Sequence, residues 1–418
     1  MFSKIIHTFV SRFASAGINF LILVLLSRVL GASVKGEVTL VVATVFGVSI
    51  VSGFLGGSAL VFLVPRCLLL PLLFPAYVWA FLVGVASFVY FTFLPLINPS
   101  YTIHIVLLSF VLSIYTINQS LLLGKNAIKV TNLLQIVQIC TTAIILILFI
   151  FVFKQKDLMA YVWALYVSFG LVCLWSCVLV SKYLKTEERI FFSSAITRRV
   201  VGLSFYNQWA YITQFMSLRL SFYWLEADFS LSQVGVYSNS VALAESVWLV
   251  SGSVSTVLFS QLANNIKETK NNLQMTIQSV QITFVSSLFL VVAMLLLPEG
   301  LYIWLFGNDF SGIKLPLYGL SVGVLVYACG LVLGHYFSGV GLQRVNALAS
   351  SIGLVATLLC GWVLIPTHGQ LGASLTASIS FVVSSSVLAY IFMRREQILV
   401  NRFFDFDGLF RRFRANKP

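Results

Sequence analysis

The sequence predicts an all-α integral membrane protein with about twelve transmembrane helices in two related halves. Three observations support this prediction. Hydrophobic residues make up 59% of the 418 residues and charged residues only 9%, whereas a soluble domain carries about 25% charged residues. Apolar runs long enough to cross a bilayer as a helix recur along the whole chain. A stretch of the first half is also repeated in the second half.

Each predicted span is an apolar run, and most runs end near glycine, proline or asparagine. The first run is too long for a cleavable signal peptide and contains Arg12, Asn19 and Arg28, so we expect it to remain as a span. The loops that join the spans are short, and the longest loop, residues 182–199, is expected to lie along the membrane surface. The predicted spans are 8–31, 38–62, 70–94, 102–123, 132–153, 159–181, 200–224, 235–261, 275–297, 315–338, 345–365 and 370–393.

An internal repeat divides the chain. When the sequence is shifted by 199 positions, residues 32–60 fall on residues 231–259 without a gap, and eight of the 29 pairs are identical, including Gly36 with Gly235. A second, shorter similarity appears at a shift of 215 positions. Both similarities have the same chain direction, which indicates a parallel repeat about an axis along the membrane normal. The predicted domains are an N-terminal six-helix lobe at 1–190, a C-terminal six-helix lobe at 191–395 and a basic cytoplasmic tail at 396–418.

The distribution of lysine and arginine predicts that both termini are cytoplasmic. With the N-terminus inside, 20 of the 26 Lys and Arg residues lie in inner segments, and Arg28 and Arg219 lie within spans near their outer ends. The basic, aromatic tail either lies on the inner leaflet or extends as a disordered positive segment, and both interpretations stay open. Four lysines lie in predicted outer loops: Lys35, Lys154, Lys156 and Lys314.

The composition argues against several classes of function. The net charge of +13 does not indicate nucleic-acid binding, because no basic stripe alternates with solvent-facing aromatic residues. The cysteines and histidines show no metal-ligand spacing, so no metal site is predicted. No nucleophile motif, paired carboxylates or phosphate-binding glycine loop is present, so the sequence predicts no catalytic residues.

Charged residues inside spans are the first candidates for a functional site, because a charge in hydrocarbon needs a partner or a water-filled cavity. Glu245 is the only acid deep in an apolar run, and it lies about 15 Å from Gly235 along a helix. Arg219 lies at a similar depth on the preceding span. Two interpretations stay open: the residues form a structural ion pair, or they face a cavity in which Glu245 titrates or binds substrate.

Further polar residues recur at helical spacing on the first and seventh spans and define two candidate cavity faces. Arg219 lies at the edge of the row on the seventh span. Arg12 and Asn19 share a row on the first span, whereas Arg28 points away from it and is expected to reach the outer interface. Hydrogen bonds between helices are the alternative explanation for the neutral residues. The candidate substrate-binding residues are Arg12, Asn19, Arg28, Asn207, Tyr211, Gln214, Arg219 and Glu245.

Four segments, in order, resemble polysaccharide-export proteins of the MATE-like MOP flippase superfamily. The end of helix 1 in these proteins is similar to SRVLGASVKGEV (27–38), and their loop into helix 8 is similar to QVGVYSNSVALAESVW (233–248). Their segment from helix 10 to helix 12 is similar to LFGNDF (305–310) followed by VNALASSIGLVATLLCGWVLIPTHGQLGAS (345–374). Among the branches of the superfamily, the chain most resembles the Wzx-like flippases of O-antigen or capsule units.

This resemblance implies a V-shaped pair of six-helix lobes around a central cavity lined by helices 1, 2, 7 and 8. It implies a transporter of the bacterial inner membrane, not an enzyme, that moves an undecaprenyl-pyrophosphate-linked oligosaccharide to the periplasmic leaflet by alternating access. The implied partners are this lipid, the bilayer and other polysaccharide-assembly proteins. No cofactor is implied, and coupling to H⁺ or Na⁺ is an option. The family often has Arg-Leu-Asp near the end of helix 7, where this chain has Arg219-Leu220-Ser221, which puts more weight on Glu245.

Alternative functions stay open. A small-molecule or drug antiporter of the same fold would be expected to have a deep acid in helix 1 or helix 7, and both spans lack one. An integral-membrane polymerase or ligase of O-antigen would be expected to carry a sizeable outer loop with catalytic arginine or histidine. The longest predicted outer loop, residues 298–314, is short for that role.

Reporter fusions test the predicted topology. A reporter fused after Arg395 should report the cytoplasm, and reporters inserted at 154–157 or 298–314 should report the outside. The physical reason is the positive-inside bias, with 20 Lys and Arg residues in inner segments and four in outer loops. A cytoplasmic signal from residues 154–157 would contradict the arrangement of two times six spans.

Overall fold

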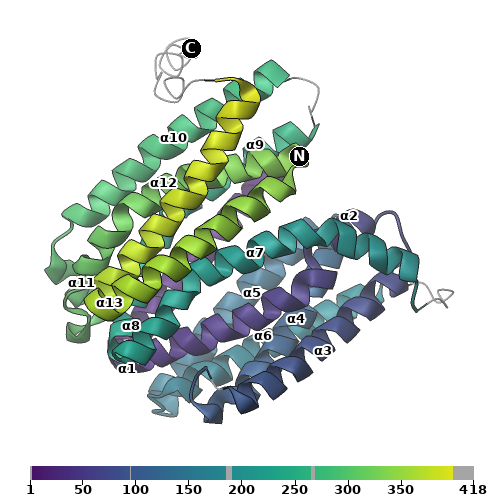
Figure 1. The fold of residues 1–418 in the computed structure, drawn as a ribbon. Coiled ribbons are helices and arrows are strands. Elements are labelled where there is room, and N and C mark those ends of the chain that lie inside the picture. The colour runs from purple at the N-terminus through teal and green to yellow at the C-terminus, as the bar shows by residue number, and fades with distance from the viewer. Residues whose placement is uncertain (1, 95, 185–190, 265–268, 399–418) are drawn as a thin grey trace. The chain divides into compact units, whose positions relative to one another are not determined.

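The computed structural model describes residues 2–94, 96–184, 191–264 and 269–398, and these residues form helices joined by short turns (Figure 1). No strand occurs among them. The chain groups into two compact units, and the boundary between them lies inside one long helix, α7 (Ser194–Asp228). Unit 1 comprises Met1–Ile212, Ser230–Gly235 and Leu305–Asp309, and unit 2 comprises Thr213–Phe229, Val236–Trp304 and Phe310–Pro418.

The other helices follow in chain order. Before α7 come α1 (Phe2–Ser52), η1 (Gly53–Leu55), α2 (Gly57–Leu63), α3 (Leu70–Phe93), η2 (Pro99–Tyr101), α4 (Thr102–Gly124), α5 (Ile128–Ile147), η3 (Leu148–Val152) and α6 (Leu158–Ser181). After it come α8 (Leu231–Ser246), α9 (Trp248–Asn264), α10 (Thr269–Leu296), α11 (Glu299–Phe306), η4 (Asn308–Phe310), α12 (Lys314–Gly339) and α13 (Gln343–Glu396). The predicted tail at 396–418 lies almost entirely outside the described residues.

The described residues contain nine helices that are long and apolar enough to cross a membrane. Two of them, Phe13–Leu63 and Gln343–Glu396, have 51 and 54 residues, more than twice the roughly 20 residues that one crossing needs. Helix α7 is not among the nine. The all-α membrane class is therefore confirmed, and the number of twelve spans stays a prediction.

Helix α1 breaks at Gly31, whose φ of 78° lies in the left-handed region that favours glycine. The sequence predicted a loop between the first two spans, but the helix resumes at Ala32, so the joint is a single residue. Lys35, expected in that loop, is instead buried in the helix. The side chain of Asp309 accepts a hydrogen bond from the backbone N–H of Ala32 at 3.4 Å. This bond satisfies a donor at the start of the new helical segment.

The two repeated segments pack directly on each other within unit 1. A Cβ atom at Gly36 would lie 2.0 Å from the carbonyl oxygen of Leu231, and a Cβ atom at Gly235 would lie 1.9 Å from the carbonyl oxygen of Ala32. The contacts are reciprocal, because the shift that pairs Gly36 with Gly235 also pairs Ala32 with Leu231. Reciprocal contacts of this kind indicate a local two-fold relation between the segments. They support the internal repeat that the sequence predicts.

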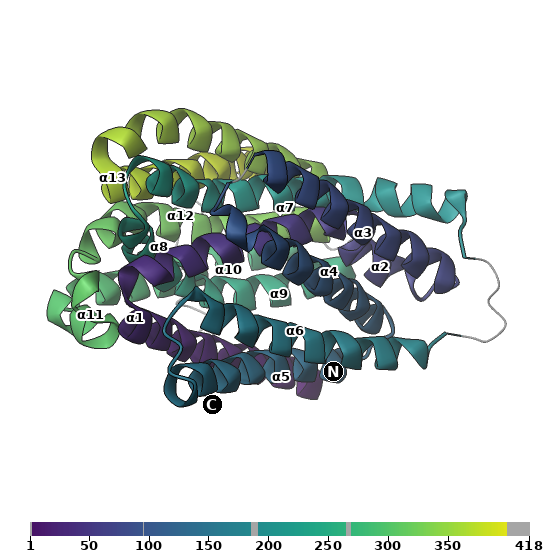
Figure 2. The ribbon, with the colours of Figure 1, turned by 90° about the horizontal axis from the view of Figure 1, so that it is seen from below.

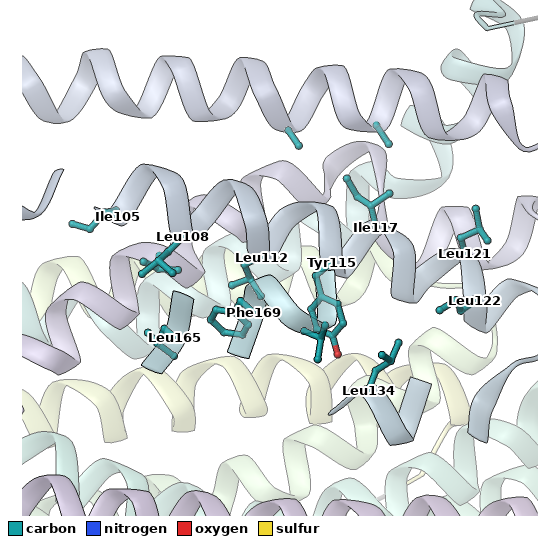
Figure 3. Close-up of a cluster of buried hydrophobic side chains, with 14 of the residues drawn as sticks. Ile105, Leu108, Leu112, Tyr115, Ile117, Leu121, Leu122, Leu134, Leu165 and Phe169 are labelled. Atoms are coloured by element: carbon teal, nitrogen blue, oxygen red, sulfur yellow. The ribbon is translucent and has the colours of Figure 1, made fainter. Parts of the chain in front are cut away.

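Apolar side chains of α4, including Leu108 and Leu121, line the core of unit 1 (Figure 3). Polar contacts connect the helices around this core. The buried side chain of Asn118 donates a hydrogen bond to Ser176 Oγ of α6 at 2.9 Å and accepts one from the hydroxyl of Tyr77 of α3. Lipid offers polar side chains no partners, so such bonds hold helices together within a membrane.

Helix α13 folds back on itself at Gly369, whose φ is 54°. A Cβ atom at Gly372 would lie 1.9 Å from the carbonyl oxygen of Leu364, so residues on the two sides of the break touch. The Oγ of Ser380 also donates a hydrogen bond to the carbonyl oxygen of Gly353 at 2.8 Å. The predicted spans 345–365 and 370–393 are therefore the two arms of one helical hairpin.

Small residues allow α12 to approach the second arm of α13 closely. A Cβ atom at Gly323 would lie 2.4 Å from the Cα of Ser378, so only glycine fits there. Gly319 and Gly330 face serines in the same way, and each pair is 55 residues apart in the sequence. A constant separation means that α12 and this arm run parallel. The serines that face Gly319, Gly323 and Gly330 are Ser374, Ser378 and Ser385.

Other helix contacts complete each unit. In unit 1, α1 packs against α3, α4, α5 and α6, and Figure 2 shows α5 and α6 side by side. In unit 2, α12 packs against α9, α10 and α13. Helix α7 contributes its N-terminal part to unit 1 and its C-terminal part to unit 2.

The glycine contact can be tested by adding one methyl group. Gly36→Ala and Gly235→Ala should each lower the melting temperature of the purified protein, because the new Cβ would overlap a carbonyl oxygen. Overpacking of this kind costs about 1–3 kcal/mol or more. Gly252→Ala is the matched control, since nothing lies within 4 Å of the added atom. Equal melting temperatures for Gly36→Ala and Gly252→Ala would contradict the close approach.

Candidate functional site

The candidate site lies in unit 2, where Arg219 of α7 and Glu245 of α8 form an ion pair. Arg219 Nη1 lies 3.0 Å from Glu245 Oε1, and Nη2 donates a hydrogen bond to Oε2 at 3.2 Å. The pair therefore has one hydrogen bond, while Glu245 Oε1 is buried and has a charge contact with Arg219 but no hydrogen bond. The two side chains keep 24% and 27% of their surface exposed. The structure therefore forms the ion pair that was one of the two interpretations of the sequence, and both side chains remain partly exposed.

The positions of both residues follow from the turn that joins their helices. Helix α7 ends at Asp228 and α8 begins at Leu231. Arg219 lies about 14 Å before the end of α7, and Glu245 lies about 21 Å after the start of α8, by the standard rise of a helix. The long side chain of arginine spans the remaining difference in depth.

A series of aromatic contacts begins at the arginine. The Arg219 guanidinium lies 5.4 Å from the ring centre of Phe222, a distance at which the cation is attracted to the ring. Phe222 contacts Tyr237 edge to face, with ring centres 5.5 Å apart. The Tyr237 hydroxyl donates a hydrogen bond to the carbonyl oxygen of Ala373 in α13 at 3.2 Å. The tyrosine of the Gly-Val-Tyr-Ser segment thus connects the helices that hold the ion pair to α13.

A second aromatic cluster, which was not predicted, includes Trp248, a near neighbour of Glu245 in the sequence. The rings of Trp248, Tyr327 and Phe381 meet, with the Tyr327 ring centre 4.7 Å from that of Trp248 and 4.8 Å from that of Phe381. Gln214 donates a hydrogen bond to the Tyr327 hydroxyl. Trp248, three residues after Glu245, was the one local signal. The other two rings come from distant helices that no sequence pattern connects.

The helix that carries Glu245 is interrupted two residues later, at Val247. The N–H of Val247 bonds to the carbonyl oxygen of Ala244, three residues back, at 3.2 Å. The span predicted at 235–261 corresponds to the candidate span Leu231–Phe259, and the sequence did not predict the turn at Val247 inside it. Within a membrane, irregular backbone is tolerated where it is buried in protein or lines a cavity, and transporter sites are commonly built beside it.

The remaining candidates are distributed over helices of unit 1. Tyr211 of α7 is 59% exposed, Asn19 of α1 is exposed, and Asn207 is half-buried in α7. Arg28 is exposed near the Gly31 break. The side chain of Arg12 lies outside the described part of the chain, so its role stays a prediction.

The ion pair limits what Arg219 can bind. A guanidinium can present the same N–H donors to a carboxylate and to a phosphate. In this structure Glu245 occupies that position beside Arg219.

Part of the chain is similar in sequence to a known protein. No family model matches the chain. The capsular polysaccharide biosynthesis protein CapF of Staphylococcus aureus is 28% identical over 172 residues, which are 41% of this chain and 43% of that protein. The chain thus matches less than half the length of this relative.

Solved structures match nearly the whole chain. An inward-facing multidrug resistance MATE family transporter of the MOP superfamily has a TM-score of 0.73 at 13% identity, covering 93% of this chain and 94% of that one. The lipid II flippase MurJ, in an inward closed conformation, has a TM-score of 0.74 at 14% identity, covering 96% and 89%. The chain therefore has the fold of these transporters, and the resemblance seen in the sequence is confirmed at the level of the fold.

Substitutions in the pair separate a structural role from a binding role. Arg219→Ala and Glu245→Ala should each lower the melting temperature, because each leaves a charge without its partner. The cost is about 3–5 kcal/mol for a fully buried pair, and partial exposure should reduce it here. The double change leaves no unpaired charge, so the melting temperature should recover. If the double variant is as unstable as either single variant, the ion pair is not what stabilises this region.

Proposed function

We propose that this protein is a flippase that moves an undecaprenyl-pyrophosphate-linked oligosaccharide from the cytoplasmic to the periplasmic leaflet of a bacterial inner membrane. The observation that carries the proposal is the combination of two similarities. The chain has the fold of MATE transporters and MurJ along more than nine-tenths of its length. Its sequence match is to a capsular polysaccharide biosynthesis protein.

Arg219 is the proposed ligand of the pyrophosphate. A pyrophosphate that enters the membrane needs a cation or several strong hydrogen-bond donors, because an unpaired charge is costly there. The guanidinium would exchange the oxygens of Glu245 for those of the substrate. Protonation of Glu245, or Na⁺ binding to it, would favour this exchange and so couple transport to an ion gradient. Gln214, Trp248 and Tyr327 offer polar and aromatic surfaces of the kind that sugars bind.

A drug antiporter is the second candidate, since the matching structures include multidrug transporters. A cationic drug needs an acid that is not already paired. Helix α7 has no acid before Glu226, α1 has none before Glu37, and Glu245 is held by Arg219. This arrangement favours an anionic substrate. A polymerase or ligase would need a catalytic loop, and the joint between α10 and α12 contains only two short helices, α11 and η4.

Complementation of a strain that lacks the gene tests the proposal. We expect the strain to lose its surface polysaccharide and to accumulate lipid-linked repeat units, and the wild-type gene to reverse both effects. Arg219→Lys should restore export in part, because lysine keeps the charge and loses the fork. The double variant Arg219→Ala, Glu245→Ala should fold and still fail to export. Normal export by the double variant would contradict substrate binding by Arg219.

The same strain provides the control for drug transport. Its sensitivity to cationic dyes and antibiotics should not change when the gene is removed. Intact surface polysaccharide together with raised drug sensitivity would favour the antiporter. In proteoliposomes, Glu245→Gln should remove the dependence of transport on a pH or Na⁺ gradient, and an unchanged dependence would exclude Glu245 as the coupling group.

A further inference from the structure

Unit 1 contains a groove between the first arm of α1 and the turn that ends α5. Its volume is about 1010 Å³. One wall is formed by a face of α1, and the other is formed by the π-helical turn η3 and the joint that leads to α6. The residues that line the groove are Leu21, Val24, Leu25, Arg28, Val29, Ile150, Phe151, Lys154 and Lys156.

The groove is apolar along most of its length and carries three cations. On α1, Arg28 lies about 10 Å beyond Leu21 along the helix axis. On the other wall, Lys154 and Lys156 follow Phe151 in the sequence. Both segments precede a joint that the topology predicted from the sequence puts outside, so the cations lie toward the outer end of each wall. All three charged side chains are exposed.

Membrane topology does not explain these lysines. The positive-inside rule accounts for cations on the cytoplasmic side, yet two of the four lysines in predicted outer loops line this groove. Two acids lie near this joint. Asp157 Oδ1 accepts a hydrogen bond from the backbone N–H of Ala160 at 3.2 Å and so caps α6, and Glu37 of α1 lies close enough to Asp157 for the two carboxylates to repel each other. Neither lysine forms an ion pair within the part of the chain that the structure describes.

We propose that this groove binds a membrane lipid with an anionic phosphate headgroup from the outer leaflet. The phosphate would lie among Arg28, Lys154 and Lys156, with the arginine as a fork and the lysines as point charges. Basic pockets between transmembrane helices hold anionic lipid headgroups in this way. Leu21 and Phe151 are 66% and 62% exposed, which suits a hydrocarbon chain and offers nothing to a free anion. The proposal does not depend on which substrate the protein transports.

Binding of phosphatidylglycerol to the purified full-length protein tests the proposal. Lipid retention is measured by native mass spectrometry, with phosphatidylcholine as the neutral lipid. Lys154→Gln with Lys156→Gln should weaken phosphatidylglycerol binding about thirtyfold, the scale expected for two cations beside an anionic lipid. The matched control, Lys125→Gln with Lys129→Gln, removes the same charge at a predicted inner joint and should leave binding within about twofold of the wild type.

Two further measurements make the result decisive. Lys154→Arg with Lys156→Arg keeps the charges and should retain binding, which separates loss of charge from loss of fold. Inorganic phosphate at millimolar concentration should not displace the lipid, because the apolar walls contribute to its binding. Equal retention of both lipids, an equal loss in the control pair, or displacement by inorganic phosphate would overturn the proposal.

Discussion

The backbone contact between Gly36 and Gly235 is the constraint on which the arrangement of unit 1 depends. Each glycine lies where a side chain would strike a carbonyl oxygen of the other repeat. Water drives no helix association inside a bilayer, so close van der Waals contact and hydrogen bonds must do so. The Gly31 break and its bond from Ala32 to Asp309 set the position of the helix segment that carries Gly36. One short stretch of α1 therefore brings together segments that are far apart in sequence.

The same physical rule explains the polar residues of the spans. Asn118 connects three helices of unit 1, and serines of α13 fill the spaces that glycines of α12 leave. Asn118 and Ser378 form hydrogen bonds with other helices, and these bonds need no substrate. The ion pair of Arg219 and Glu245 differs from them, because about a quarter of the surface of each side chain is exposed to solvent and the pair lies beside an interruption of the helix. Exposure, charge and irregular backbone together identify it as the candidate site.

Most of the cations of the chain fall into three environments. Most lie in predicted inner segments and agree with the positive-inside rule. Arg219 is paired within a span. Arg28, Lys154 and Lys156 line a groove whose walls are otherwise apolar. A substrate with a pyrophosphate and a long lipid chain would use the second environment, and an anionic lipid of the bilayer would use the third, so the two proposals assign different phosphates to different places.

The sequence by itself determined the membrane class, the positions of most helices and the repeat, because hydropathy and spacing are properties of neighbouring residues. It also identified Arg219 and Glu245, since a charge in an apolar run is visible without a structure. It could not decide whether they pair. It placed joints near Gly31 and Gly369 but expected loops there, and it did not predict the turn at Val247. Tyr327 and Phe381 escaped prediction as well. Only the tertiary structure decided these features, because each depends on which distant helix supplies the neighbouring atom. Packing between helices does not produce a periodic pattern in the sequence.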